Sequence, residues 1–180
     1  LDTLLLSHDD NDHTGGAEAL LAGWPVGEIV HGLPDDSPLL AGRLQKPCQA
    51  GLRWQRDGVS FSILWPPDGY SGKGDNARSC VLLVDNGKQR LLLPGDLGGR
   101  EEAMLVENGL PQTGIVVAGH HGGKGSSLPT LVDALQPQYA VFSVGYRNRF
   151  RHPRADTLER FAAAGVTNLR TDESGALVFD

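Results

Sequence analysis

Residues 7–16 read SHDDNDHTGG and hold the densest group of potential metal ligands in the chain. Two imidazoles and three carboxylates fall within the six residues 8–13. The stretch follows the apolar run Leu4-Leu5-Leu6 and precedes a Gly-Gly pair at which a helical pattern opens. A strand that ends in a loop rich in imidazole and carboxylate groups is a typical place for a metal ion. The sequence therefore predicts a metal-binding loop directly after its first strand.

The size and composition of the chain predict a single domain over residues 1–180, because 39% hydrophobic residues suffice to bury a core. The formal net charge of −6 excludes binding of nucleic acid by bulk charge alone, so an anionic substrate needs a local basic patch or a bound cation. No apolar run approaches the roughly 20 residues of a membrane span, and the chain begins inside a strand without the segments of a signal peptide. We expect a soluble piece of a larger protein.

The two cysteines, Cys48 and Cys80, lie 32 positions apart without the spacing of a zinc site. Two buried free thiols and one disulfide are both compatible with this pattern. A disulfide would imply an oxidising compartment.

Hydrophobic periodicity and turn residues predict a mixture of strands and helices. Strands are expected at 4–6, 28–31, 52–56, 59–64, 81–84, 89–93, 115–118, 139–144, 168–170 and 176–179. Helices are expected at 14–21 with Thr14 as its cap, 99–108, 128–135 and 155–164, with one further helical turn in the loop 34–42. Hairpins come early and strand-helix units come late, which predicts an α/β layered sandwich of sheets covered by helices.

Candidate ligands stand at the ends of three predicted strands. They are His8, Asp10, Asp12 and His13, then Asp96, then His120 and His121. A lone histidine is more often structural, as we expect for His31 on its apolar strand. Several ligands at strand ends that share one sheet edge instead indicate a metal centre. Imidazole and carboxylate without thiolate suit zinc, manganese or iron, and a pair of such ions activates water for hydrolysis.

The loop 146–154, YRNRFRHPR, places four arginines and a histidine within nine residues of an acidic chain. Arginine binds phosphate through two parallel hydrogen bonds, so the loop is a candidate clamp for a polyanion. The alternative is a solvated basic loop that offsets nearby acidic residues. Tyr146 and Phe150 can stack on bases of a single strand, although aromatic residues at alternating positions are as often part of a core.

Four motifs together resemble a known family. They are the metal-binding loop 7–16, LLPGD at 92–96, GHHGG at 119–123 with the serine pair 126–127, and FSVGYRNRFRHP at 142–153. The first motif resembles the metallo-β-lactamase superfamily, whose fold is a four-layer αββα sandwich. The combination is similar to the C-terminal domain of the ComEC family of DNA-internalisation competence proteins, along essentially the whole chain.

The resemblance implies two divalent metal ions and seven candidate ligands: His8, Asp10, Asp12, His13, Asp96, His120 and His121. His8 and Asp10 would hold one ion, Asp96 would bridge the pair, and the remaining ligands would hold the other. Of the two adjacent histidines, His120 is preferred because it is nearer the strand end.

The chain departs from the broad superfamily pattern in three ways. Asp10 stands where most members carry a second histidine, and no histidine between His31 and His120 supplies the usual third imidazole of the first site. The harder donor set favours Mn²⁺, with Zn²⁺ possible. Only residues 1–6 precede the metal-binding loop, so we expect the opening strands of the fold to be missing and a sheet edge to be exposed.

By the same resemblance, the chain is expected to be a metal-dependent phosphodiesterase that degrades the non-transported strand of DNA during uptake. Asp12 and His152 are its candidate catalytic residues, with His152 protonating the leaving oxygen or steadying the phosphate. The candidate substrate-binding residues are Lys124, Ser126, Ser127, Arg147, Asn148 and Arg149. The parent would be an inner-membrane protein whose channel portion is a partner, with this domain on the periplasmic side.

Two alternatives remain open at this point. One is a metallo-hydrolase of another ester or lactam, such as a phosphocholine ester or a β-lactam. The other is a non-catalytic module that binds DNA or gates a channel and carries a vestigial metal site.

Overall fold

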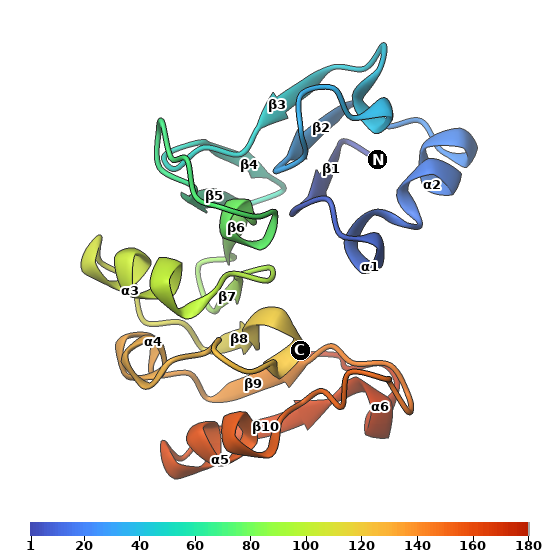
Figure 1. Cartoon of the computed structure of the whole chain (residues 1–180). Coiled ribbons are helices and arrows are strands. Elements are labelled where there is room, and N and C mark those ends of the chain that lie inside the picture. Colours follow the sequence, from blue (N-terminus) through green and yellow to red (C-terminus); the bar gives the residue numbers. More distant parts are fainter. Residues whose placement is uncertain (180) are drawn as a thin grey trace.

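The computed structural model, which describes residues 1–179, contains two β-sheets (Figure 1). The smaller sheet has three parallel strands in the order β1 (Thr3–Leu6), β2 (Glu28–His31) and β3 (Gln45–Pro47). The larger sheet has seven strands. In spatial order they are β10 (Thr167–Arg170), β9 (Tyr139–Phe142), β8 (Ile115–Val117), β7 (Arg90–Leu93), β6 (Val81–Asp85), β5 (Val59–Trp65) and β4 (Arg53–Arg56).

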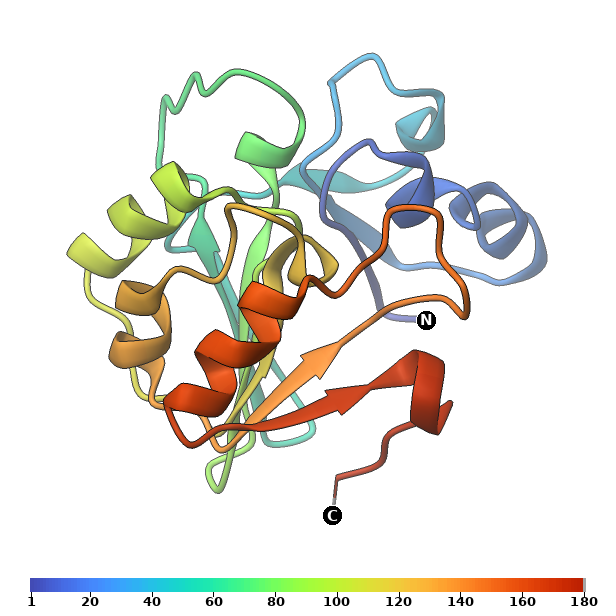
Figure 2. The ribbon, with the colours of Figure 1, turned by 60° about the horizontal axis from the view of Figure 1, so that its bottom comes forward.

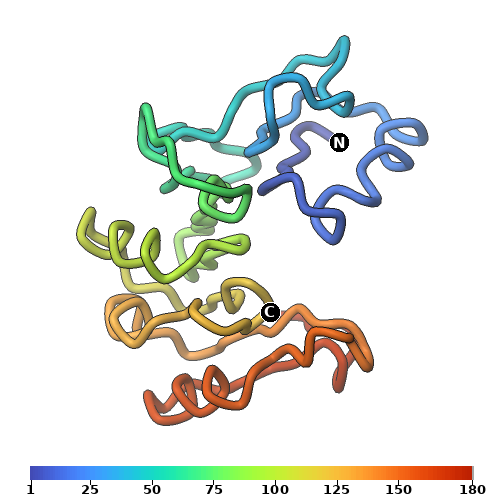
Figure 3. The backbone as a smooth tube through the Cα atoms, viewed as in Figure 1, coloured from blue at the N-terminus to red at the C-terminus, as the bar shows by residue number. Residues whose placement is uncertain are grey.

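The larger sheet is mixed. Strands β4 to β7 form an antiparallel meander through two hairpins, whereas β7 to β10 are parallel and are connected by helices. Figure 3 shows the chain crossing the molecule in sequence order, from the blue N-terminal segment at one end to the red α5 and β10 at the other. Because β7 and β8 are parallel, the loops after them emerge at the same edge of the sheet.

The helices lie on the outer faces of the two sheets. They are α1 (Asn11–Thr14), α2 (Ala17–Gly23), α3 (Gly99–Glu107), α4 (Pro129–Leu135), α5 (Ala155–Ala163) and α6 (Thr171–Ser174), with 3₁₀ turns η1 (Pro38–Leu40), η2 (Asn76–Arg78) and η3 (Gly119–Gly122). Figure 2 shows α3, α4 and α5 on one side of the larger sheet and the N-terminal segment with α1 and α2 on the other.

Three apolar clusters correspond to the three interfaces of a four-layer arrangement. The largest joins the seven-stranded sheet to α3, α4 and α5 and includes Trp65 and Phe142. A second, around Ile63, fills the space between the two sheets. The third, around Leu21 and Ile29, joins the smaller sheet to α2. The expected four-layer αββα arrangement is therefore confirmed.

A disulfide joins Cys48, directly after β3, to Cys80, directly before β6. The open choice between free thiols and a bridge is thus decided for the bridge. The bond ties the smaller sheet to the larger one beside the metal-binding loop, since the Cys80 amide also donates to the Ser7 carbonyl at 2.9 Å.

Several sequence predictions were wrong in detail. The expected helix 14–21 is two helices, because the chain turns at Gly15-Gly16, and Thr14 donates its hydroxyl to the Asp10 carbonyl at 3.0 Å instead of capping a helix start. Residues 176–179 form no strand, and β3 and α6 were not predicted. His31 is structural as expected, since it is buried and lies 2.6 Å from the Gln45 side chain. The proposed loss of strands before Leu1 stays a prediction.

Candidate metal centre

Two histidines of the metal-binding loop are oriented by the serine that precedes it. The Ser7 hydroxyl lies 3.1 Å from Nδ1 of His8 and 3.0 Å from Nδ1 of His13. A hydroxyl oxygen has two lone pairs, so it can accept a hydrogen bond from both rings. Each ring then presents Nε2 as its free ligand atom, which is the arrangement found when a second group fixes a metal-binding histidine. His8 is fully buried at the end of β1, and His13 is partly exposed in α1.

His121 is fixed in the same way from the opposite side of the site. Nδ1 lies 2.8 Å from the backbone oxygen of Ser143, and a carbonyl only accepts, so this nitrogen carries the proton. Nε2 then faces Asp12 Oδ2 at 3.1 Å and His13 Nε2 at 3.3 Å. The ring reaches this position because His120 and His121 both adopt left-handed backbone conformations, with φ of 50° and 54°.

Asp96 lies in the middle of the group. It follows β7, is 4% exposed, and places Oδ1 3.2 Å from Nε2 of His13 and 3.6 Å from Nε2 of His121. Gly95 permits this approach, because its φ is +58° and a Cβ there would lie 2.9 Å from Cβ of Ser79. Ser79 in turn accepts the Asp96 amide at 3.1 Å and lies 3.4 Å from Nδ1 of His8.

The side chains form two overlapping sets that meet the requirements of divalent ions. One atom each from His8, His13 and Asp96 lies within 4.8 Å of the other two, and the same holds for Asp12, His13 and His121. The donor chemistry fits, because fixed Nε2 atoms and carboxylates are the ligands that zinc and manganese accept.

Two predicted ligands stand outside these sets. Asp10 is half exposed and contacts only His8, with Oδ2 3.3 Å from Nε2. His120, preferred over His121 from its place nearer the strand end, lies 3.8 Å from Asp96 Oδ2. The left-handed turn reverses the expected order, so the second histidine of the pair points into the site. We replace His120 by His121 in the proposed ligand set.

Asp10 belongs to neither set, so its carboxylate no longer supports the preference for Mn²⁺ over Zn²⁺. The remaining donors are three imidazoles and two carboxylates, a combination that suits either ion.

The charges of the site follow its burial and its pairing. Burial lowers the pKa of His8, and the neighbouring His13 lowers it further. Burial also lowers the pKa of His13, but the hydrogen bond to Asp96 and the charges of Asp96, Asp12 and Asp10 outweigh it, so this pKa is raised. The pKa of Asp96 is lowered, since the hydrogen bond from His13 and the nearby histidines outweigh its burial. In the metal-free protein, His13 and Asp96 therefore each favour the charged form of the other.

The basic loop lies beside this site. Figure 2 shows the orange loop after β9 next to α1, although the two are far apart in sequence. Between them is a cleft of about 430 Å³, called the site cleft here, which is lined by Asp12, His121, Ser143, Val144, Gly145, Asn148, Phe150 and His152. The cleft thus shares two members of the candidate metal centre.

The structure gives Asn148 a role within the loop. Its amide nitrogen donates to the His152 carbonyl at 2.7 Å, and its side-chain oxygen accepts the His152 amide at 2.9 Å. These bonds hold the loop closed and occupy the amide, while Asn148 also lines the site cleft, so the predicted substrate contact stays a prediction. Arg147 and Arg149 are exposed and lie over the rings of Tyr146 and Phe150, at 5.1 and 4.8 Å from the ring centres.

Ser126 and Ser127 were also predicted to bind substrate, but both are buried, and their polar groups are bonded within the protein. The Ser126 hydroxyl donates to the Gly119 carbonyl at 2.7 Å, and the Ser127 amide donates to buried Glu102 at 2.7 Å. Arg160 donates to the carbonyls of both serines, at 3.1 and 2.9 Å. The pair therefore anchors the loop that carries His121. Lys124 of the same loop is exposed.

A basic hollow lies on the other side of the loop and was not predicted. It has a volume of about 440 Å³ and is lined by Lys124, Arg151, Arg154, Ala155 and Asp156. Side chains of the loop alternate, so Asn148, Phe150 and His152 line the site cleft and Arg151 lines the hollow. The sequence showed the arginines but not the sides to which they point.

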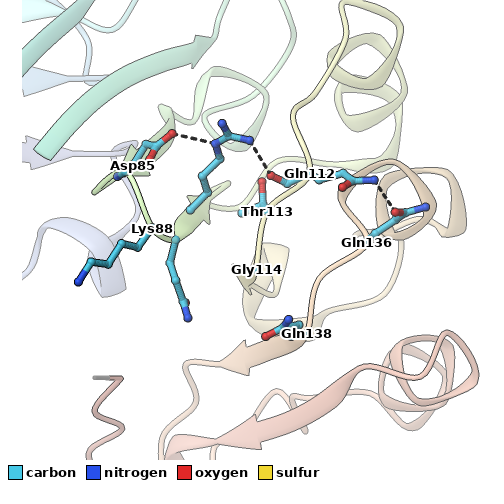
Figure 4. Close-up of a pocket in the computed structure, with 10 residues that line it drawn as sticks. Asp85, Lys88, Gln112, Thr113, Gly114, Gln136 and Gln138 are labelled. Atoms are coloured by element: carbon cyan, nitrogen blue, oxygen red, sulfur yellow. Dashed lines mark hydrogen bonds and ion pairs between the residues drawn. The ribbon is translucent and has the colours of Figure 1, made fainter.

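Another hollow, of about 430 Å³, lies at the opposite end of the larger sheet (Figure 4). It is bordered by the β6–β7 turn and by Gly114 and Gln138, which precede the parallel strands β8 and β9. Several of its polar groups are paired with each other, as in the ion pair of Arg90 with Asp85 at 2.8 Å. It holds none of the candidate ligands.

Three further residues position the site and were missed from the sequence: Ser7, Ser79 and Ser143. Serine is common in loops, so only Ser7, next to the first ligand, offered a local signal. The other two approach the site through the strand arrangement.

The fold and this site define a class of protein. The model of the metallo-beta-lactamase superfamily matches residues 1–146, and the chain belongs to this superfamily. Its fold is that of metal-dependent hydrolases, and the family implies divalent metal ions at the site described above.

Within that class, the chain is similar to competence proteins. It is 42% identical to competence protein ComA of Neisseria gonorrhoeae over 99% of this chain and 25% of that protein. It is 35% identical to recombination protein 2 of Haemophilus influenzae over 89% of this chain, and 33% identical to ComE operon protein 3 of Bacillus subtilis over 99% of it. These comparisons confirm the resemblance found in the sequence. The chain spans 25% or less of each of these relatives.

Solved structures share the fold at low identity. The diiron β-hydroxylase CmlA of Streptomyces venezuelae aligns with a TM-score of 0.66 and 16% identity over 94% of this chain and 43% of that one. The metallo hydrolase Igni18 of Ignicoccus hospitalis aligns with a TM-score of 0.57 and 18% identity over 94% and 75%. None of the helices within residues 1–179 has the length and apolar character of a membrane span.

Proposed function

We propose that the chain is a metal-dependent phosphodiesterase that cleaves DNA and that it serves DNA uptake as part of a larger membrane protein. One observation carries the proposal most. Two overlapping sets of metal ligands open into a cleft whose rim is the basic loop 146–154. The similarity to competence proteins supports DNA as the substrate.

We propose that His8, His13 and Asp96 hold the first ion, and that Asp12 and His121 hold the second; His13 belongs to both sets, but its one free Nε2 binds a single ion. When bound, such ions supply an activated water and neutralise the charge that develops on phosphate. The chain's own part is to keep Nε2 of each histidine aimed at the site through Ser7 and the Ser143 carbonyl.

Substrate contacts come from groups around the site cleft. Arg147 and Arg149 do not line the cleft but are exposed on the loop that borders it, and each presents two parallel donors that match the oxygens of a phosphate. Lys124 in the basic hollow adds positive charge on the opposite side of the loop. This local charge explains how a chain with a net charge of −6 can hold a polyanion. It also favours DNA over an uncharged lactam.

The surroundings of His152 support the second of its two predicted roles, that of steadying the phosphate. Burial lowers its pKa, and the neighbouring His120, His121 and Arg154 lower it further. The lowered pKa favours the neutral ring over the imidazolium that would protonate a leaving oxygen. We propose that it donates a hydrogen bond to a phosphate oxygen of the substrate.

The proposed activity is tested with purified protein and a labelled single-stranded oligonucleotide. We expect no cleavage after treatment with a chelator and recovery on addition of Mn²⁺ or Zn²⁺. Asp12→Asn, which keeps the size of the side chain and removes the charge, is expected to abolish cleavage. Asp85→Asn, a change of the same kind at the opposite end of the sheet, is the matched control. Cleavage by Asp12→Asn at the wild-type rate would refute the proposed site.

We further propose that this domain lies on the periplasmic side of the inner membrane. The disulfide supports this placement, because such bonds persist in oxidising compartments. Labelling of thiols in protein exported to the periplasm is expected to find neither Cys48 nor Cys80 free. Two free thiols there would count against the placement.

A further inference from the structure

Phe150 projects into the site cleft although it is an apolar side chain. Its ring is 57% exposed, and it lines the same cleft as Asp12 and His121. The sequence left open whether this aromatic residue belongs to a core. The structure decides against a core, so the exposed ring needs another explanation.

Three rings lead from the candidate metal centre to the cleft rim in nearly parallel planes. His121 and His152 have an interplanar angle of 25° with centres 6.4 Å apart. His152 and Phe150 have an angle of 14° with centres 5.9 Å apart. A planar group stacked on Phe150 would therefore lie in the same cleft as His121, with His152 between the two rings. Its plane would be nearly parallel to the planes of these rings.

The loop holds the Phe150 backbone in place before any substrate arrives. The Asn148 side chain is hydrogen-bonded to both the amide and the carbonyl of His152, and the Arg151 amide donates to the Asn148 carbonyl at 3.3 Å. The guanidinium of Arg149 lies 4.8 Å from the centre of the Phe150 ring, so a base that stacks on this face takes the place of an exposed planar group. The backbone that carries the ring is thus fixed before substrate arrives, and the ring already accepts a planar group.

We propose that the site cleft takes one unstacked nucleobase of single-stranded DNA, which stacks on Phe150 while an adjoining phosphate lies at the candidate metal centre. This inference rests on the proposed phosphodiesterase function. Its physical basis is that every base has a π-face, so stacking on an aromatic ring binds any sequence. A base inside a duplex is already stacked and paired, so it must be extruded at a cost before it can enter. The platform therefore selects single strands or frayed ends.

The same loop offers a matched control. Tyr146 is 75% exposed and also lies under an arginine, Arg147, at 5.1 Å from the ring centre. It is not among the residues that line the site cleft. Phe150→Ala and Tyr146→Ala thus remove similar exposed rings from one loop, and only the first removes the proposed platform.

The experiment uses a series of short oligonucleotides, each with one abasic position, and measures KM with wild-type protein and Mn²⁺. When the abasic site falls at the position whose base stacks on Phe150, counted from the cleaved bond, KM is expected to rise at least about fivefold. Phe150→Ala is expected to raise KM for the intact strand by a similar factor and to lose sensitivity to that position. Phe150→Trp restores the sensitivity, and Tyr146→Ala retains it at the same position.

A second measurement separates this inference from the proposed activity. The fluorescence of a 2-aminopurine base at the sensitive position, or at each position if none is cleaved, is recorded with metal-free protein. It is expected to rise because the base leaves the stack of its neighbours, and Phe150→Ala is expected to abolish the rise. Cleavage without any effect of Phe150→Ala on KM or on this fluorescence change would overturn the platform and leave the phosphodiesterase standing. A fluorescence change that depends on Phe150 without cleavage would overturn the phosphodiesterase alone.

Discussion

Replacing Ser7 by alanine removes the hydroxyl that orients two of the proposed ligands at once. In the structure this oxygen lies 3.1 Å from Nδ1 of His8 and 3.0 Å from Nδ1 of His13. His8 keeps a second oxygen, that of Ser79 at 3.4 Å, whereas no second hydrogen-bond partner is found for Nδ1 of His13 among residues 1–179. The loss is therefore expected to fall mainly on His13, which belongs to both ligand sets.

The magnitude follows from the two bonds. A hydrogen bond contributes about 1 kcal/mol net, and a partly compensated one less, so Ser7→Ala is expected to cost about 1.5 kcal/mol of metal binding. This corresponds to roughly a tenfold weaker affinity, within the range of about 10- to 100-fold seen for groups that orient metal ligands. Adding Ser79→Ala is expected to cost more than the two single changes together, because His8 then loses its remaining acceptor.

The assay is competition of Mn²⁺ or Zn²⁺ between the protein and a chromophoric chelator, which needs no catalytic activity. Ser143→Ala is the control, because His121 is held by the backbone oxygen of this residue and not by its hydroxyl. An affinity of Ser7→Ala within about twofold of wild type would refute the positioning role, as would an equal loss in Ser143→Ala.

Three further predictions concern stability and charge. In metal-free protein, the lowered pKa of Asp96 stabilises the fold at pH values above the usual carboxyl range, and this stabilisation is lost as the pH falls. The free energy of unfolding of Asp96→Asn, measured by urea titration, should therefore be about 2 kcal/mol below that of the wild type at pH 5. The difference between the two proteins should close towards pH 3. Equal gaps at both pH values would contradict this. Removal of the disulfide by Cys48→Ala with Cys80→Ala is expected to cost about 3 to 4 kcal/mol for a loop of 32 residues, measured by thermal unfolding, whereas an unchanged melting temperature would argue against the bridge. Lys124→Ala is expected to weaken DNA binding and to reduce its dependence on salt by about one ion, as seen in anisotropy titrations; an unchanged salt slope would exclude this phosphate contact.

Much of the fold could be predicted because its elements carry local signals. Hairpins form around Asp57-Gly58 and Asn86-Gly87 as expected. Asp57 and Gly58 adopt the left-handed conformations of a two-residue turn, with φ of 51° and 80°, whereas the second hairpin closes through the loop 86–89, in which the Asn86 side chain accepts from the Gln89 amide at 2.8 Å. Strand β3 was missed because its residues are all exposed and show no apolar alternation. The expected strand 176–179 alternates in sequence but finds no neighbouring strand among the described residues.

The candidate site was predicted as a list of residues rather than as an arrangement. Ligand types and strand ends correctly pointed to His8, Asp12, His13 and Asp96, which the structure brings together. Sequence order could not distinguish His120 from His121, because the choice depends on two left-handed backbone conformations. The sequence also could not show that Ser126 and Ser127 are buried, because serine occurs both in loops that bind substrate and in loops whose side chains only hold the backbone in place.

The sequence by itself determined which chemical groups are available and the ends of strands at which they stand. Residue type decides donor chemistry, and apolar runs mark strands through local propensity, so both can be read without a fold. Only the tertiary structure decided which groups meet. The parallel pairing of β7 with β8 brings Asp96 to His121, and the packing of the two sheets brings both to the loop 7–16. Such contacts depend on residues far apart in the chain, and their geometry follows from packing rather than from any local pattern.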